Sequence, residues 1–267
     1  MSDQYLHRAD APFGDSVWEQ IDHAVVEAAK SQLSARRLLH TMGPFGLGLK
    51  AMPLGDAQAK GKTIEGVAVS MSAGLPLAML RAEFSLPVRD IAAYEQSGVP
   101  LDLGSAAQAA IAVARQEDQL VYNGFGGTGL LNASGAGSAK LKSWNEVGAA
   151  AEDVIAAATE LDDAGFHGPY TLALAPKLYN RLFRRYPQGQ MTELEHIRQI
   201  AADGVVKAAG IAAGGVLVDT SGSFASIVLG QDLMAGFVGP AGGEYEFSVT
   251  ETLALWIRQP QAVCVLK

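Results

Sequence analysis

The N-terminal part of the chain carries an amphipathic pattern that predicts a helix from Ser16 to about Leu39. Its apolar positions share the spacing of one helix face: Trp18, Ile21, Val25, Ala28, Ala29 and Leu33. Ser16 and Glu19 form a capping-box pattern, so we expect Ser16 to be the N-cap. The helical pattern ends by Gly43. An irregular arm precedes the helix.

Glycine and small residues dominate from 44 to about 62, which argues against a packed element there. From Thr63 to Leu86 apolar residues alternate as in β-strands: Val67, Val69, Leu80, Ala82 and Phe84. We expect an extended hairpin whose two β-rich stretches are joined through Gly74-Leu75-Pro76. A long hairpin with little core of its own usually finds a partner chain.

Capping signals predict further helices. Ser105 as a cap and Gly124 as a stop predict a helix over 106–122. Capping boxes at Ser143 and Thr192 predict helices from Ser143 to Gly165 and over 192–202. Pro176 as a first helical residue predicts a short helix over 176–183. The expected strands are 170–174, 216–219, 224–230, 245–250, 252–258 and 262–266. Helices and strands do not alternate strictly, so the predicted class is α+β and not a doubly wound sheet.

Composition narrows the classes of function. Of the 267 residues 49% are apolar and 18% are charged, which predicts a sizeable core. The formal net charge of −8 argues against a nucleic-acid binder, and a single cysteine excludes a disulfide scaffold. Apolar stretches are too short for a membrane span, and the first residues lack the apolar core of a signal peptide. We expect a soluble, cytoplasmic protein that buries much of its surface against copies of itself.

Two glycine-rich segments resemble nucleotide-binding motifs. Gly124 to Gly129 has the spacing of a dinucleotide fingerprint, but it follows an expected helix instead of a strand, so a plain glycine loop is favoured. Gly55 to Thr63 resembles a P-loop, but it has five residues between the glycines where the motif needs four. We therefore expect no nucleotide and no other cofactor.

No catalytic or metal-binding constellation emerges. Glu193 and His196 form one Glu-x-x-His pattern, where a carboxylate-bridged di-iron site needs two, so a solvated helix face is favoured. The remaining histidines show no metal-ligand spacing, and Cys264 lies among apolar residues as a small buried hydrophobe. The Arg36/Arg37 pair is kept as a possible docking point. The sequence predicts neither an enzyme nor a metal site.

Several short stretches, in order along the chain, resemble one family, the encapsulins, which are bacterial and archaeal shell proteins. The resembling stretches are 18–22, 32–36, 43–46, 80–84, 168–172, 230–233, 249–252 and the β-rich stretch to Lys267. This resemblance implies a fold like that of the HK97 phage capsid protein. The implied parts are an N-terminal arm and helix (1–43), an E-loop hairpin that pairs with a neighbouring subunit (44–83), a P-domain with a spine helix (84–122), an A-domain (123–221), and C-terminal strands that return to the P-domain (222–267).

The resemblance also implies assembly in place of catalysis. Identical subunits, about sixty or a multiple of that number, would close an icosahedral nanocompartment. Its cargo would be a dye-decolourising peroxidase or a ferritin-like protein, which points to oxidative stress or iron storage. A hydrophobic C-terminal tail of the cargo would bind the inner wall. The positions matched to that binding site are Ala28, Leu33, Arg36, His40, Asp232, Leu233, Thr252 and Ala254.

A loop between two expected helices matches the loop that lines the fivefold pore in the family. Its residues are Tyr186, Pro187, Gln188, Gly189 and Gln190. The loop has no acidic residue, so strong cation selectivity is not expected.

Two other functions remain open. A major capsid protein of a virus or prophage would share the fold, but its inner surface would be basic in order to neutralise DNA, against the net charge of −8. A peptide-directed enzyme or protease would need a nucleophile and a base, and the sequence offers no such pair.

Overall fold

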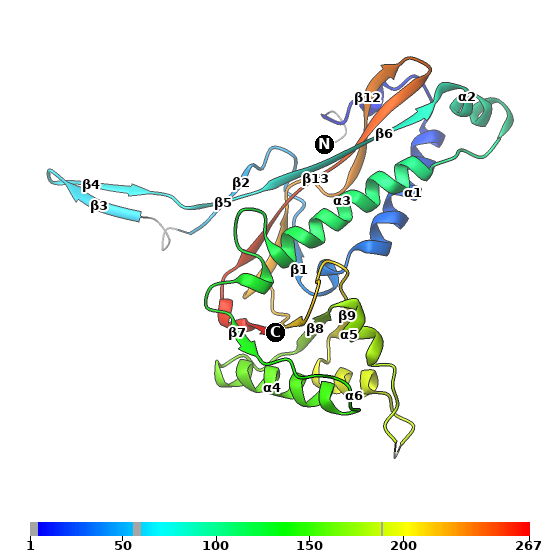
Figure 1. Cartoon of the computed structure of the whole chain (residues 1–267). Helices are drawn as coiled ribbons and strands as arrows, with labels where there is room; N and C mark the ends of the chain where they lie inside the picture. The colour runs from blue at the N-terminus through cyan, green and yellow to red at the C-terminus, as the bar shows by residue number, and fades with distance from the viewer. Residues whose placement is uncertain (1–4, 56–59, 188) are drawn as a thin grey trace.

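The computed structural model describes residues 5–55, 60–187 and 189–267. Figure 1 shows two bodies and a thin ribbon that projects from the upper one. Helices and sheets are mixed without strict alternation, which confirms the predicted α+β class. Within the described residues, no helix is both long enough and apolar enough to cross a membrane.

A five-stranded sheet forms the centre of the upper body. Its long strand β13 (Glu244–Ile257) pairs antiparallel with β6 (Ala78–Pro87) on one side. On the other side β13 pairs first with β12 (Met234–Ala241) and then with β11 (Ala225–Leu229), and β1 (His40–Met42) joins β11 in parallel. The expected strands 245–250 and 252–258 are therefore one strand, a correction, because the intervening Glu251 is fully buried instead of forming a turn.

Two long helices cover one face of this sheet. α1 (Asp15–Gln32) packs along α3 (Gly104–Asn123), and α3 crosses β6 and β13. An aromatic cluster joins the helices to the strands, with neighbouring ring centroids 5.0–6.2 Å apart: Phe13, Trp18, Phe84, Phe237, Tyr245 and Phe247. The short helix α2 (Val88–Ser97), which the sequence did not predict, follows β6.

The first helix differs from its prediction at both ends. Gly14 is the N-cap of α1, and the Ser16 side chain makes no capping bond. The helix stops well before Leu39, because the backbone N–H of Ala35 donates to the Asp118 carboxylate of α3 (2.9 Å). A short 3-10 helix, η3 (Ala35–Arg37), follows in its place.

The long helix α3 fits its prediction more closely. It starts just before Ser105, which is not the cap because its hydroxyl donates to the Ser85 carbonyl oxygen (3.0 Å). Gly124 closes α3 as predicted, with its N–H donating to the carbonyl of Leu120 (3.0 Å). The N-terminal segment and the upper sheet both pack against this helix.

The lower body contains a second five-stranded sheet in the order β7-β14-β10-β8-β9. Its strands are β7 (Gly137–Ala139), β8 (Tyr170–Leu174), β9 (Gly204–Lys207), β10 (Gly215–Asp219) and β14 (Val263–Leu266). Its helices are α4 (Ala149–Asp163), α5 (Pro176–Arg181) and α6 (Glu193–Ile200). Cys264 is fully buried here, as expected, and burial raises the pKa of its thiol to about 11.

Capping signals in the lower body had mixed success. The Thr192–Glu195 capping box is present, and Pro176 lies in the first turn of α5, as predicted. The box at Ser143 is wrong, because α4 begins only at Ala149. Trp144 is instead fully buried, and its indole N–H donates to Asp153 Oδ2 (2.9 Å), which holds the preceding segment in a turn.

The projecting ribbon is an antiparallel hairpin with two parts. β2 (Ala51–Pro53) pairs with β5 (Gly74–Pro76) at its root, and β3 (Lys60–Ile64) pairs with β4 (Val67–Met71) at its tip. The chain reverses at Glu65 and Gly66, both in left-handed backbone conformations (φ 50° and 82°). The expected junction at Gly74-Leu75-Pro76 is therefore wrong, since those residues form a strand.

Candidate assembly and peptide-docking surfaces

An ionic cluster at the end of the N-terminal segment joins three parts of the upper body. The Arg36 guanidinium donates to both Glu117 oxygens (2.8 and 2.9 Å) and to Asp232 Oδ1 (2.8 Å), and it also pairs with Glu251. Glu117 belongs to α3, Glu251 to β13, and Asp232 to the turn between β11 and β12. The Glu117 and Glu251 side chains are fully buried. Arg36 is thus occupied by this cluster, and only Arg37 of the predicted docking pair is exposed.

Burial sets the protonation of this cluster. Desolvation, followed by the nearby charge of Glu117, raises the pKa of Glu251 to about 9, so Glu251 keeps its proton at neutral pH. Desolvation also raises the pKa of Glu117, although the Arg36 bond opposes the rise. Burial weakens the charged form of Arg36, but the bond and charge of Glu117 outweigh it and raise its pKa. Glu251 Oε2 has no hydrogen-bond partner among the described residues, so no bond at this oxygen offsets the desolvation of the carboxyl.

A second set of bonds holds Arg36 in place. The backbone N–H of Ser34 donates to both Asp118 oxygens (3.1 Å each), and the N–H of Ala35 adds a bond of 2.9 Å. The Ser34 hydroxyl also lies 3.0 Å from the Tyr122 hydroxyl oxygen. Two neighbouring carboxylates of α3 thus hold this segment: Asp118 binds the backbone just before Arg36, and Glu117 binds the Arg36 side chain.

Five of the predicted peptide-binding residues border the helices and the turn around this cluster. Ala28, Leu33 and Leu233 are half-buried against the aromatic core of the upper body. Arg36 and Asp232 form the ion pair described above, and the Asp232 side chain is 48% exposed. Apolar side chains and one accessible carboxylate therefore share this face.

The other three predicted peptide-binding residues differ. Thr252 and Ala254 are 5% and 4% exposed, and the Thr252 hydroxyl accepts a bond from the Gln231 N–H (2.7 Å). Both side chains are buried in the single chain, and Ala254 borders a hollow between β13 and the end of α3, so their contact with a peptide stays a prediction. His40 lines a separate open hollow, where its ring packs against Gly222 beside Arg258.

The predicted pore loop lies at the far end of the lower body, between α5 and α6 (Figure 1). Tyr186, Pro187, Gly189 and Gln190 are described, whereas Gln188 lies outside the described residues. The Tyr186 hydroxyl is 2.8 Å from His196 Nδ1, and the Tyr186 N–H donates to the carbonyl of Met191 (3.1 Å). These bonds hold the start of the loop against α6.

The single Glu-x-x-His pattern is divided between two unrelated contacts. Glu193 is fully buried and pairs with Arg184 (2.8 Å), whereas His196 bonds to Tyr186. Among the described residues no group of three or more His, Cys, Asp or Glu side chains is placed to hold a metal ion. Glu193 is therefore a structural ion pair and not a solvated residue, which corrects the predicted solvated face.

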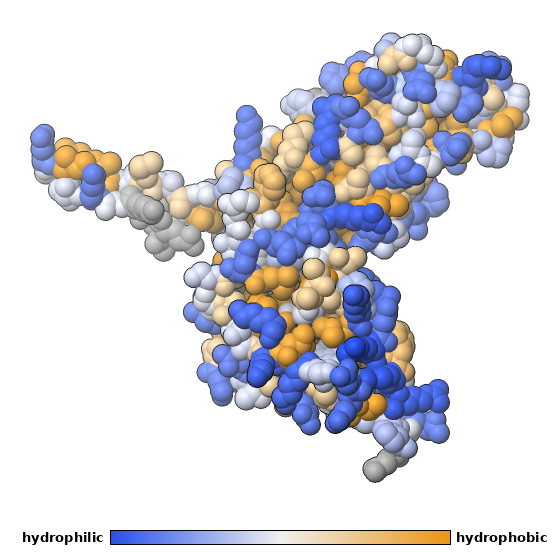
Figure 2. All heavy atoms as spheres, in the orientation of Figure 1, coloured by the Kyte–Doolittle hydropathy of each residue, from blue (hydrophilic) through white to orange (hydrophobic). Residues whose placement is uncertain are grey.

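The hairpin tip exposes apolar side chains that none of the described residues covers fully. Its exposed apolar side chains are Ile64 (45%), Val67 (62%), Val69 (42%) and Met71 (72%). Figure 2 shows them as a hydrophobic band on a ribbon that stands clear of both bodies. The resembling P-loop segment also falls here: its residues 56–59 lie outside the described residues, and 61–63 belong to β3.

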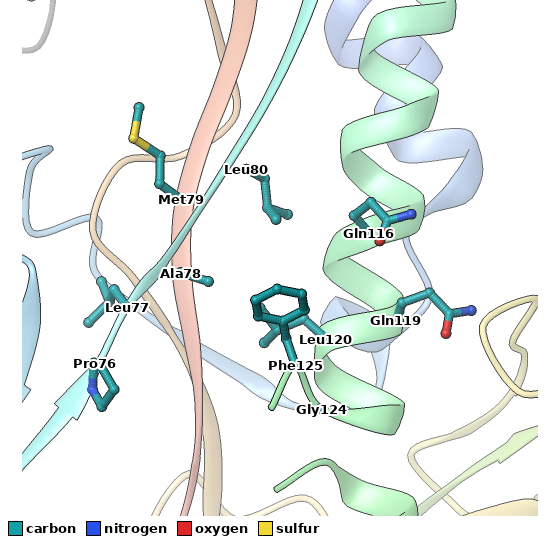
Figure 3. A pocket seen from close by; sticks show the side chains of 10 residues that line it. All are labelled: Pro76, Leu77, Ala78, Met79, Leu80, Gln116, Gln119, Leu120, Gly124 and Phe125. Atoms are coloured by element: carbon teal, nitrogen blue, oxygen red, sulfur yellow. The ribbon is translucent and has the colours of Figure 1, made fainter. Parts of the chain in front are cut away.

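A cavity of about 420 Å³ lies where the hairpin root meets α3 (Figure 3). Its walls are Pro76, Leu77, Ala78, Met79, Leu80, Gln116, Gln119, Leu120, Gly124 and Phe125. The Gly124–Gly129 segment follows α3, as predicted, and leads into the 3-10 helix η5 (Leu130–Asn132), so it is a loop between two helices and not a turn from a strand into a helix. No pattern in the sequence signals this cavity or the 88% exposure of Phe125.

Comparisons with known proteins agree on one protein family. A family model described as "Encapsulating protein for peroxidase" matches residues 3–254. The type 1 encapsulin shell protein of Myxococcus xanthus is 30% identical over 98% of this chain and 96% of that protein. A diheme-cytochrome-encapsulin shell fusion protein of Kuenenia stuttgartiensis is 30% identical over 94% of this chain and 72% of its own length.

Solved structures share the fold. A virus-like particle from Pyrococcus furiosus has a TM-score of 0.76 at 23% identity, over 94% of this chain and 99% of that one. The capsid of the Myoviridae phage XM1 has a TM-score of 0.57 at 15% identity, over 87% of this chain and 90% of that one. The fold is thus the HK97-like capsid fold that the sequence resemblance implied.

Proposed function

This chain belongs to the encapsulin shell proteins, and we propose that its copies close into an icosahedral container of about sixty subunits. The projecting hairpin carries this proposal. A two-stranded ribbon is marginally stable alone in water, and this one exposes apolar side chains on both strands. Pairing with a neighbouring copy supplies cover that the described residues of the single chain do not provide.

The parts of the shell follow from the same proposal. Residues 44–83 form the E-loop that reaches the neighbour, and 84–122 together with 222–267 form the P-domain. Residues 123–221 form the A-domain, which gathers around the symmetry axes. The loop of Tyr186, Pro187, Gly189 and Gln190 then lines a pore. These four residues include no carboxylate, so the pore is not strongly cation-selective.

We propose that the cargo binds the face around Leu33 and Leu233 through a hydrophobic C-terminal tail. Half-buried apolar side chains lie there beside the accessible carboxylate of Asp232, a combination that suits an aliphatic peptide with a polar register point. His40 takes part only if the peptide extends into the hollow of Arg258. The cargo is a dye-decolourising peroxidase or a ferritin-like protein.

Catalysis belongs to the cargo under this proposal. The buried carboxylates of the described chain are engaged with arginines or backbone groups instead of facing an open cleft. The single, buried cysteine suits the reducing cytoplasm. Oxidative-stress or iron-storage chemistry would therefore take place inside the compartment and not on the shell.

Negative-stain electron microscopy of the protein produced alone tests assembly. We expect closed, uniform, hollow particles without nucleic acid. A monomer or small oligomer at micromolar concentration would overturn the shell assignment for this chain. Particles that contain nucleic acid would favour the alternative of a viral or prophage capsid.

A further inference from the structure

The glycine loop after α3 is built to close tightly. A Cβ atom on Gly124 would lie 2.4 Å from the Gly127 carbonyl oxygen, and one on Gly129 would lie 2.4 Å from the Gly124 nitrogen. Gly124 and Gly126 also have positive φ angles (78° and 63°). Asn132 fastens the loop by accepting from the Gly129 N–H (2.6 Å) and donating to the Asn123 carbonyl (2.9 Å). The glycines therefore serve loop closure.

This closed loop presents one large side chain. Phe125 is 88% exposed, the highest exposed fraction among the exposed large apolar side chains of the described residues. In Figure 3 its ring stands beside Leu120, between β6 and the end of α3. It forms one wall of the 420 Å³ cavity and also borders a second hollow of about 310 Å³ on the sheet side. An exposed aromatic ring between two hollows is an unusual surface for a chain that stays in water.

The surface around Phe125 is continuous with the hairpin and free of charge. Leu75 and Pro76, at the hairpin root, line these hollows together with Phe125. The described residues that line the two hollows are all apolar, glycine, threonine or glutamine. A partner that covers this surface therefore desolvates no ionic group, which keeps the cost of burial low.

We propose that a second copy of this chain, seated along the hairpin, covers the two hollows and buries Phe125 as an anchor residue. Aromatic side chains enclosed in apolar pockets at the centre of an interface carry much of the binding free energy. The chain's own hairpin brings a neighbour to this place, since its root forms part of the same surface. This inference rests on the proposed shell function and adds to it one inter-subunit contact outside the hairpin tip.

Truncation of the ring tests the anchor. Phe125→Ala should raise the protein concentration at which half of the chains are in particles by about tenfold or more. The matched control is Tyr5→Ala, which removes a 60% exposed ring from the N-terminal arm, outside the parts proposed to meet a neighbour, and should assemble like the wild type. Light scattering and gel filtration over a dilution series give the populations, and circular dichroism should show the same fold. Wild-type assembly by Phe125→Ala would overturn the inference.

A thiol probe provides a second test that does not depend on weakened assembly. The natural Cys264 is buried, so a Phe125→Cys variant carries one accessible thiol. We expect this thiol to react with a maleimide at least tenfold more slowly in particles than in dissociated chains. Equal rates in the two states would overturn the proposed contact. A wild-type chain that forms no particles would instead overturn the shell function itself.

Discussion

Arg36 holds Glu117 through two parallel hydrogen bonds of 2.8 and 2.9 Å, across 81 residues of sequence. Such bidentate pairs combine charge with fixed geometry. Because Glu117 is fully buried, the pair fastens the segment after α1 onto the spine helix. The remaining N–H groups of Arg36 reach Asp232 and Glu251, so one side chain also ties that helix to the sheet. The proposed cargo face borders this cluster.

Removal of the guanidinium should destabilise the chain strongly. Arg36→Met leaves the Glu117 charge buried without its partner, and breaking a buried pair in this way typically costs about 3–5 kcal/mol. Urea denaturation at fixed protein concentration measures the loss. Arg37→Met is the control, because Arg37 is exposed and should change stability by less than about 0.5 kcal/mol. Equal midpoints for the two variants would show that the cluster adds no stability.

The Glu251 proton should make stability depend on pH. Its pKa is raised from 4.5 to about 9 in the fold, so between these values the folded chain binds more protons than the unfolded chain. Stability from this group therefore falls as pH rises, by at most about 1.4 kcal/mol per pH unit. Glu251→Gln removes this titration. As pH rises from 5 to 9, the melting temperature of Glu251→Gln should increase relative to that of the wild type. A constant difference between the two melting temperatures over this range would contradict the assignment.

Two glycines of the loop should respond differently to the same methyl group. Gly129→Ala places a Cβ 2.4 Å from the backbone nitrogen of Gly124, whereas the nearest described atom to a Cβ on Gly127 is 4.0 Å away and Gly127 has no positive φ. Forced overpacking typically costs about 1–3 kcal/mol, so Gly129→Ala should unfold at lower urea. Gly127→Ala should stay within about 0.5 kcal/mol of the wild type. A reversed order would mean that the loop closes differently.

The proposed cargo face should be sensitive to one charge. Leu33→Asp puts a carboxylate among half-buried apolar side chains beside Asp232, and we expect at least about tenfold weaker retention of tailed cargo. The control is Val99→Asp, at a 51% exposed position between α2 and α3 that belongs to no segment of the proposed face. Co-purification of a reporter enzyme that carries the tail measures loading, and particle size checks assembly. Equal loading by both variants would move the peptide site elsewhere.

Local signals predicted elements where side chains were free to act locally. Thr192 caps α6 because Glu195 completes the reciprocal bonds within one turn. Ser105 had the right residue type, but its hydroxyl bonds to Ser85 on β6, a partner that no local pattern reveals. The box at Ser143 failed for a similar reason, since Trp144 packs in the lower core and bonds to Asp153. Tertiary contacts decided these helix starts.

The surfaces were less predictable than the fold. Arg36 next to Arg37 suggested a free cationic pair, yet the partners of Arg36 lie 81, 196 and 215 residues away in sequence. The glycine spacing correctly indicated a loop, but it could not show that the loop closes on itself and presents Phe125. The hairpin was predicted from alternation, whereas its turn was misplaced because Glu65 adopts a left-handed conformation that sequence seldom signals.

The order in which the two sheets acquire their strands has a consequence for protein synthesis. β13 is central to the upper sheet, and β14 lies inside the lower one. Neither sheet is therefore complete until residues 244–266 have been synthesised. While the ribosome still holds those residues, neither core can close, although the hairpin has already emerged. We therefore expect a nascent chain to join a particle only after its translation has passed β14, because a chain that ends earlier lacks an inner strand of at least one sheet.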